Sequence, residues 1–137
     1  MTALVDTGFL YATLDTSDKN HQRVTDALVN VTDVLLLPTI VLVELTYLLQ
    51  ARLGHTAIRR FIQQLEDSPL QFEVITKADV PRIYELLDQY ADMRLDFVDA
   101  AIVTLAERLN IRRILTVDER DFCIIRPRYC DYFDILP

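Results

Sequence analysis

Short, uninterrupted apolar runs alternate with longer stretches of helical spacing along this chain. The run Val34–Leu37 is typical of a strand buried on both faces of a sheet, and Ala3–Val5 and Ile114–Val117 are interpreted as further short strands. The pattern predicts strands over 3–5, 34–37, 71–75, 114–117, 124–125 and 132–136, and helices over 9–14, 19–30, 40–52, 56–66, 77–90 and 97–109. Strands that alternate with helices predict the α/β class, with a mainly parallel central sheet in a three-layer α/β/α sandwich.

Composition sets the scale of this fold. A chain of 137 residues that is 51% hydrophobic fits one domain over 1–137 with a sizeable core. The longest apolar stretch, Val34 to Leu49, is interrupted by Pro38 and Glu44 and is too short for a membrane span. Since the N-terminus also has no secretory leader pattern, we expect a cytoplasmic protein with two free thiols and no membrane partner.

The charge of the chain is acidic, with 14 Lys and Arg against 21 Asp and Glu, for a formal net charge of -7. This balance argues against a nucleic-acid-binding protein that works through a broad basic face. The objection weakens if several of the acids are metal ligands, because two divalent cations would bring -7 to -3.

Two acids follow predicted strands directly. Asp6 follows the run 3–5 and Asp118 follows the run 114–117. In an open parallel sheet the C-terminal ends of the strands share one edge, where ligands usually bind. Asp6 has a simpler interpretation as a helix N-cap, which is common for Asp in such a turn.

Two further acids lie in apolar surroundings on predicted helices. Glu44 has Ile40, Val41, Tyr47 and Leu48 at its i±3 and i±4 positions, so we expect a buried carboxylate that is bound by a metal or paired with a distant arginine. Asp99 lies in the first turn of helix 97–109, for which Asp96 is the expected N-cap. The helix dipole favours an acid there, but the neighbours Leu95, Ile102 and Val103 favour burial.

Asp6, Glu44, Asp99 and Asp118 therefore form the predicted site. Four carboxylates brought together repel one another, and Mg²⁺ or Mn²⁺ with oxygen ligands would relieve that repulsion. Metal-assisted hydrolysis of a phosphodiester follows as the predicted chemistry. The hydroxyls of Thr7 and Thr116 are placed to orient a ligand or a phosphate oxygen around this site.

Four segments carry a resemblance to a known family. The segments LVDTGFLYATLD, LPTIVLVEL, LDFVDAAIVTLAERLNIRRILTVDERDF and FDILP resemble the PIN-domain family, specifically VapC-type toxins of toxin–antitoxin pairs. The resemblance implies that Asp6, Glu44, Asp99 and Asp118 are the acidic quartet and that Asp121 is an occasional fifth acid. It also implies an Mg²⁺- or Mn²⁺-dependent endoribonuclease that acts on RNA as a homodimer and is inhibited by a cognate VapB-like antitoxin. The family's Asp-x-x-His is matched by Asp18 and His21, which we interpret as a helix cap and a solvated histidine.

Two other functions remain open at this stage. A receiver-like signalling module also holds Mg²⁺ among acids at strand ends, but it needs a phosphorylatable Asp after a middle strand and a lysine after a late one. A PIN-fold domain that acts only through protein contacts would have no reason to keep four acids in apolar settings. Substrate contacts are the least defined, because any of five late arginines could meet RNA phosphates or could pair with nearby acids: Arg112, Arg113, Arg120, Arg126 and Arg128.

Overall fold

The computed structural model describes residues 1–137 and is built around one five-stranded sheet in which every neighbouring pair is parallel, in the order β3-β2-β1-β4-β5. The strands are β1 (Thr2–Val5), β2 (Val34–Pro38), β3 (Gln71–Glu73), β4 (Arg113–Leu115) and β5 (Asp134–Leu136). The helices are α1 (Thr7–Leu14), α2 (His21–Val29), α3 (Thr39–Leu53), α4 (His55–Leu65), α5 (Val80–Gln89), α6 (Phe97–Leu109) and α7 (Glu119–Ile124), with short 3₁₀ turns at Lys77–Asp79 and Ala91–Met93.

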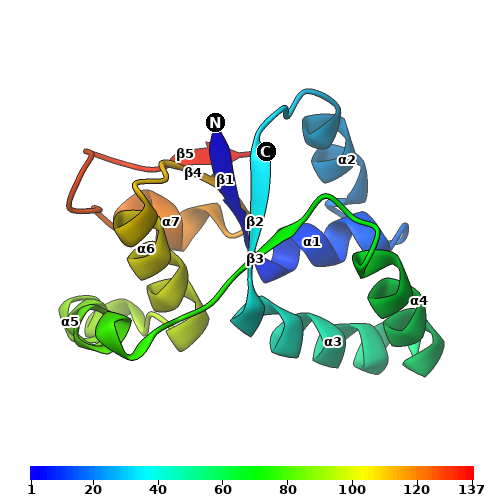
Figure 1. Cartoon of the computed structure of the whole chain (residues 1–137), viewed down its shortest axis with the longest axis horizontal. Coiled ribbons are helices and arrows are strands. Elements are labelled where there is room, and N and C mark those ends of the chain that lie inside the picture. The colour runs from blue at the N-terminus through cyan, green and yellow to red at the C-terminus, as the bar shows by residue number, and fades with distance from the viewer.

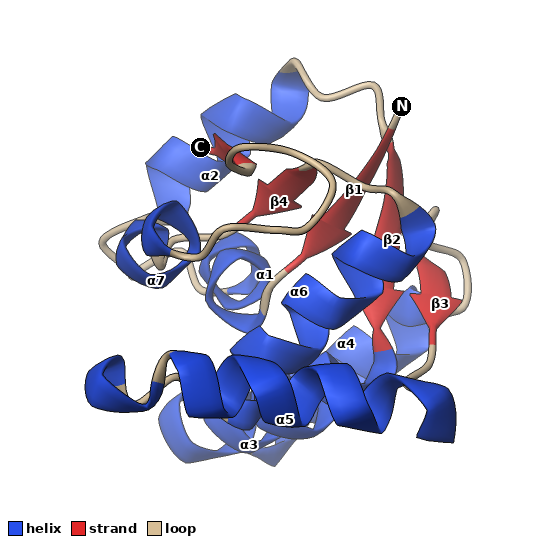
Figure 2. Cartoon of the chain, turned by 90° about the vertical axis from the view of Figure 1, so that its left-hand side faces the viewer, coloured by secondary structure: helices blue, strands red, loops and turns tan.

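Helices cover both faces of the sheet. Figure 1 shows the strands between α1, α2 and α4 on one side and α5, α6 and α7 on the other, with α3 starting at the end of β2. In Figure 2 the molecule is turned so that α5 and α6 lie in front of the sheet. The predicted α/β/α sandwich is confirmed, and the sheet is parallel throughout. No helix in the structure combines the length and the apolar character needed to cross a membrane.

The central strand, β1, is buried because it is paired on both edges and covered on both faces. Leu4 pairs in register with Leu36 of β2 and with Ile114 of β4. The side chains of Leu4 and Ile114 are fully buried in the main hydrophobic core. Since both neighbouring strands run parallel to β1, their C-terminal ends open onto the same edge of the sheet.

α6 is the helix that brings an acid to this edge. Its middle residues, Ala100 to Ala106, are all buried, and the small alanines allow the helix to lie close to the sheet. The Asp96 side chain caps the start of α6 as predicted, and Asn110 ends the helix in the left-handed conformation with φ 54°. The buried body of α6 thus fixes the position of its first turn.

One predicted strand is wrong. Residues 124–125 were expected to be extended, but Ile124 is the last residue of α7. A two-residue apolar run carries no periodicity, and here Phe122 and Ile125 enter the core from a helical turn and its end. The strand predicted over 132–136 is confirmed in part, as β5.

Candidate metal centre

Asp6 lies at the C-terminal end of β1 and links that strand to α1. Its backbone N–H donates a 2.9 Å hydrogen bond to the carbonyl of Leu115, so the ladder with β4 continues to this residue. Its Oδ1 accepts a 2.8 Å hydrogen bond from the Thr7 N–H, and its Oδ2 accepts a 2.8 Å bond from the Thr116 hydroxyl. Asp6 is therefore both the predicted N-cap of α1 and a buried acid at the sheet edge.

The environment of Asp6 disfavours its charge. Burial raises the pKa of Asp6 to about 6, against the opposing effect of the hydrogen bonds from Thr116 and Thr7. The charges of Glu44 and Asp118 raise this pKa further. A pKa raised to about 6 despite two hydrogen-bond donors shows that the Asp6 carboxylate lacks a compensating positive charge, which a bound cation would supply.

Asp99 occupies the first turn of α6 and is 6% exposed. Its backbone N–H donates a 2.8 Å hydrogen bond to Oδ1 of Asp96, so the cap and the site share one helical turn. Burial, followed by the charges of Asp6, Asp96 and Asp118, raises the pKa of Asp99 to about 9. At Asp99, burial and the neighbouring negative charges therefore outweigh the stabilising effect of the helix dipole on the ionised carboxylate.

Asp118 and Asp121 complete the cluster: Asp118 is the N-cap of α7, and Asp121 lies in the first turn of that helix. The Asp118 N–H donates a 2.9 Å hydrogen bond to the Thr116 hydroxyl. Desolvation and the charge of Asp121 raise the pKa of Asp118, although its side chain is exposed at the rim. Asp99, Asp118 and Asp121 each place a carboxylate oxygen within 4.8 Å of the others, close enough to share one cation.

Glu44 differs from the sequence prediction. We expected a buried carboxylate, but Glu44 is exposed on α3, whose core side is made by Val41, Leu45 and Leu49. Its charge nevertheless acts on Asp6, so Glu44 lies at the outer rim of the same acidic cluster. The place of Glu44 in the site stays a prediction, while its predicted burial is wrong.

The donor set fits a hard divalent cation. All the acidic groups offer oxygen, and burial together with their mutual repulsion raises the pKa values of Asp99 and Asp118. The hydroxyl oxygen of Thr7, next to Asp6, is buried and has no hydrogen-bond partner. An unsatisfied buried oxygen costs free energy unless something binds it, and a hydrated cation would supply that partner.

Other predicted polar residues have structural contacts elsewhere. The His21 ring nitrogen Nδ1 lies 2.7 Å from the Ala12 carbonyl oxygen, and Asp18 accepts a 2.8 Å hydrogen bond from the Asn20 N–H. The contacts are structural, but both predicted details are wrong: α2 has Asn20 as its N-cap with no side-chain cap hydrogen bond, so Asp18 holds a turn and not the helix end, and His21 is half-buried and not solvated.

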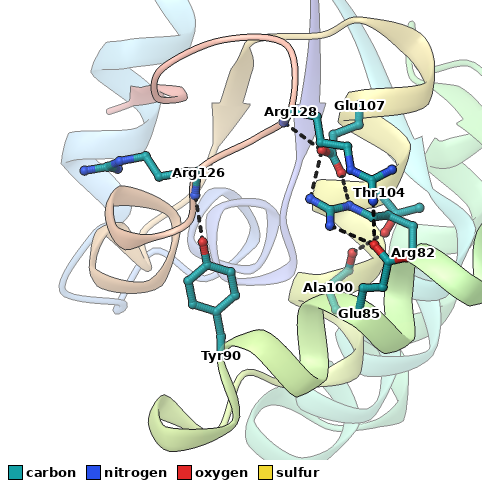
Figure 3. Close-up of polar contacts among 8 residues, drawn as sticks. All are labelled: Arg82, Glu85, Tyr90, Ala100, Thr104, Glu107, Arg126 and Arg128. Carbon is teal, nitrogen blue, oxygen red and sulfur yellow. Dashed lines mark hydrogen bonds and ion pairs between the residues drawn. The ribbon is translucent and has the colours of Figure 1, made fainter.

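Two of the five late arginines are held in ion pairs. Arg113 pairs with Asp33 and Asp134, and Arg128 pairs with Glu85. Figure 3 shows Arg128 in a network with Arg82 and Glu107 that joins the C-terminal segment to α5 and α6. The remaining three, which make no ion pair, are Arg112, Arg120 and Arg126.

A PIN domain family model matches residues 3–126 of the chain, which include all the acids of the cluster. The chain belongs to the PIN-domain family. Ribonuclease VapC26 of Mycobacterium tuberculosis is 30% identical to this PIN domain over 134 residues, which cover 98% of the chain and 99% of the relative.

Solved structures share the fold of this PIN domain. VapC20 of Mycobacterium tuberculosis, described as a toxin that cleaves the sarcin–ricin loop, superposes with a TM-score of 0.75 at 23% identity, covering 82% of this chain and 86% of that one. VapBC2 from Rickettsia felis, bound to a promoter DNA fragment, superposes with a TM-score of 0.73 at 14% identity over the whole of both chains. A toxin–antitoxin complex from Klebsiella pneumoniae gives a TM-score of 0.68 at 20% identity, covering 96% of this chain and 99% of that one.

Family membership excludes the receiver-like alternative, and the strand order agrees. Receiver-type sheets have the order 2-1-3-4-5, whereas this PIN domain has β1 in the centre and β2 and β3 on one side. The two lysines of the chain, Lys19 and Lys77, follow neither β4 nor β5.

Sequence reasoning missed one member of the cluster. We assigned Asp96 only a capping role, but its charge also acts on Asp99 and Asp118. The i, i+3 spacing of Asp96 and Asp99 was the available signal, because residues three apart in a helix share a face.

Proposed function

We propose that this PIN domain is a divalent-metal-dependent endoribonuclease and the toxin of a VapBC-type toxin–antitoxin pair. The observation that carries the proposal is the convergence of Asp6, Asp99 and Asp118 at one sheet edge, with raised pKa values that a bound cation would lower. The relative named as a ribonuclease, matched over nearly all of both chains, supports the same activity.

In this proposal Asp6, Glu44, Asp99 and Asp118 hold Mg²⁺ or Mn²⁺. Asp121, whose carboxylate lies within 4.8 Å of those of Asp99 and Asp118, is a further ligand or binds a water that is a ligand. When bound, the cation supplies Lewis-acid chemistry, which acidifies water and offsets negative charge on a phosphodiester. No histidine, cysteine or serine nucleophile is required for this hydrolysis.

The chain's own residues prepare the site in three ways. Thr116 directs Oδ2 of Asp6 through its hydroxyl and positions the Asp118 backbone at the same time. Burial and the neighbouring charges keep the Asp99 carboxyl protonated at neutral pH, and a bound cation would favour its ionised form. The partnerless Thr7 hydroxyl orients water or a phosphate oxygen beside Asp6.

RNA and an antitoxin are the partners we propose. The solved relatives include a toxin–antitoxin complex and a VapBC assembly, which supports a VapB-like antitoxin for this chain. A homodimer remains a prediction from the family resemblance.

The test is cleavage of an end-labelled mixture of transfer, ribosomal and messenger RNA by purified protein in Mg²⁺ or Mn²⁺. We expect discrete products that EDTA, Asp6→Asn and Asp99→Asn each abolish. Asp18→Asn is the matched control, because Asp18 makes a local turn contact away from the cluster and its loss should leave cleavage unchanged.

The competing proposal is a PIN domain that acts only through protein contacts. This alternative would be supported if the protein, freed of antitoxin, binds Mn²⁺ more weakly than micromolar and cleaves none of the RNA classes. Full activity of Asp99→Asn would overturn the proposed site directly.

A further inference from the structure

Two arginines lie at the starts of the helices that carry the acidic cluster. Arg94 is two residues before Asp96, the N-cap of α6, and Arg120 is two residues after Asp118, the N-cap of α7. Two residues of chain span at most about 7 Å, so the backbone of each arginine lies close to a capping acid. The carboxylates of Asp99 in α6 and of Asp118 have oxygens within 4.8 Å of one another, so both arginines flank the same acids.

A second contact joins the segments that carry these arginines. The Arg126 N–H, just after α7, donates a 3.0 Å hydrogen bond to the hydroxyl of Tyr90, at the end of α5 (Figure 3). The Tyr90 carbonyl accepts a 3.4 Å hydrogen bond from the Leu95 N–H, which closes the turn that contains Arg94. The turn before α6 and the segment with α7 therefore form one side of the site.

The other arginines of the chain are engaged or distant. Five of them form ion pairs: Arg23, Arg82, Arg108, Arg113 and Arg128. Three more lie at the far end of α3 or on α4: Arg52, Arg59 and Arg60. Arg112 precedes β4, at the edge of the sheet opposite the acids, and Arg126 donates a 2.7 Å hydrogen bond to the Cys123 carbonyl. Arg94 and Arg120 remain, both exposed and both without an ion pair beside the acids.

The backbone at Arg94 indicates that this side chain is not there for the fold. Arg94 has φ 55° and ψ 46°, the left-handed region that Gly adopts freely and Asn tolerates best among residues with a Cβ. The other left-handed positions of the chain carry those two residue types, as Gly54 and Asn110. Disfavoured backbone conformations of this kind cluster at functional sites. An exposed arginine without an ion pair gains nothing for folding here, so its charge serves another purpose.

The proposed substrate makes that purpose specific. RNA that approaches the acids brings phosphates to the most negative part of a chain whose net charge is -7. Guanidinium groups beside the acids offset this repulsion and bind phosphate oxygens in a bidentate manner. We propose, resting on the ribonuclease function above, that Arg94 and Arg120 are positioning residues that bind the RNA phosphates next to the scissile phosphodiester, Arg94 on the α6 side of the acids and Arg120 on the α7 side.

The test is the salt dependence of binding of a fluorescently labelled octaribonucleotide of random sequence. All proteins carry Asp99→Asn to prevent cleavage, and anisotropy gives the affinity over a series of KCl concentrations in EDTA. Arg94→Asn and Arg120→Gln should each weaken binding about 3- to 10-fold and reduce the slope of log affinity against log salt by about 0.7, the loss of one phosphate contact. Arg60→Gln and Arg112→Gln remove arginines away from the acids and should change neither value.

Two further measurements separate phosphate binding from a structural role. With Asp99 intact and Mg²⁺ present, Arg94→Asn and Arg120→Gln should raise KM for RNA cleavage and leave kcat within about twofold, because these contacts hold the ground state and the transition state alike. Arg94→Asn should not lower the urea midpoint of unfolding, since Asn tolerates the left-handed conformation. Arg120→Lys keeps the charge and should retain most of the salt slope.

The opposite results would overturn the proposal. Salt slopes of Arg94→Asn and Arg120→Gln equal to those of the two control variants would exclude phosphate contacts, and a lower kcat with an unchanged KM would exclude a binding role. A lower urea midpoint in Arg94→Asn would assign Arg94 to the fold. A failure of the ribonuclease proposal is seen separately, as absence of cleavage by the protein with Asp99 intact, and salt-dependent RNA binding through the two arginines would survive it.

Discussion

The hydroxyl of Thr116 donates a 2.8 Å hydrogen bond to Oδ2 of Asp6, although the two residues are 110 positions apart. The Thr116 hydroxyl oxygen also accepts a 2.9 Å hydrogen bond from the Asp118 backbone N–H. One buried hydroxyl therefore fixes two acids of the cluster, at the ends of two neighbouring strands.

We expect Thr116→Val to weaken Mn²⁺ binding at neutral pH by about 10-fold, as outer-shell substitutions at metal sites commonly do. The hydrogen bond from Thr116 lowers the pKa of Asp6, so its loss raises that pKa and the metal must displace a more tightly held proton. Isothermal titration calorimetry measures the affinity. Thr116→Ser keeps the hydroxyl and should bind like the unmodified protein; equal affinity in Thr116→Val would contradict the role assigned to this residue.

The metal-free protein should lose stability as the pH rises from 5 to 9. The folded-state pKa values of Asp6, about 6, and Asp99, about 9, exceed the ordinary value of 3.8, so the folded protein binds more protons than the unfolded chain across this range. The stabilisation is complete below the ordinary pKa and is lost as the pH passes the folded-state values. Urea unfolding in EDTA at pH 5, 7 and 9 measures how steeply the free energy of unfolding falls with pH.

Asp99→Asn is the control for this pH dependence. It should flatten the slope between pH 7 and pH 9 and raise the free energy of unfolding at pH 9 by about 1–3 kcal/mol, because the buried charge is gone. Saturating Mn²⁺ should reverse the trend in the unmodified protein only. A slope that is the same in both proteins would show that other groups cause it.

Glu107→Gln should destabilise the protein by about 2–4 kcal/mol. The Glu107 carboxylate accepts hydrogen bonds of 2.7 and 3.1 Å from Arg82 and one of 2.8 Å from the Arg128 N–H, and its side chain is only 9% exposed. Glu85→Gln, 51% exposed in the same network (Figure 3), should cost less than about 1 kcal/mol. Urea unfolding measures the free energy of unfolding of both variants. An equal loss in the two would show that burial of the Glu107 ion pair is not the cause of the destabilisation.

Gly8→Ala should destabilise the protein by about 1–3 kcal/mol and weaken Mn²⁺ binding. A Cβ at position 8 would lie 2.8 Å from Cγ2 of Val117, the residue before Asp118, so α1 or the β4 turn must shift. Adding Val117→Ala removes the contacting methyl group and should recover both properties in part. A double variant no better than Gly8→Ala would show that another contact causes the effect.

Much of the site could be predicted because parallel strands end at one edge. Asp6 and Asp118 were identified from their positions after short apolar runs, and the sheet brings the two residues together. Asp99 was identified from apolar neighbours that are indeed buried, such as Ile102 and Val103.

The burial of Glu44 was predicted wrongly because the apolar pattern of its helix is compatible with more than one buried face. α3 is apolar on nearly every side, so the sequence could not show that Val41 and Leu45 face the core while Val43 and Tyr47 face solvent. Glu44 was predicted to be buried on that account. Periodicity identifies a helix, but only tertiary packing decides which of two apolar faces is covered.

The order of the strands has a consequence for synthesis of the chain. β4 and the segment with Asp118 pair beside β1, which is made long before them, and β5 then covers the open edge of β4. A chain that stops before β4 carries Asp6, Glu44 and Asp99 but lacks Asp118 and Asp121. The group formed by Asp99, Asp118 and Asp121 can therefore assemble only after the segment that follows β4 has been made.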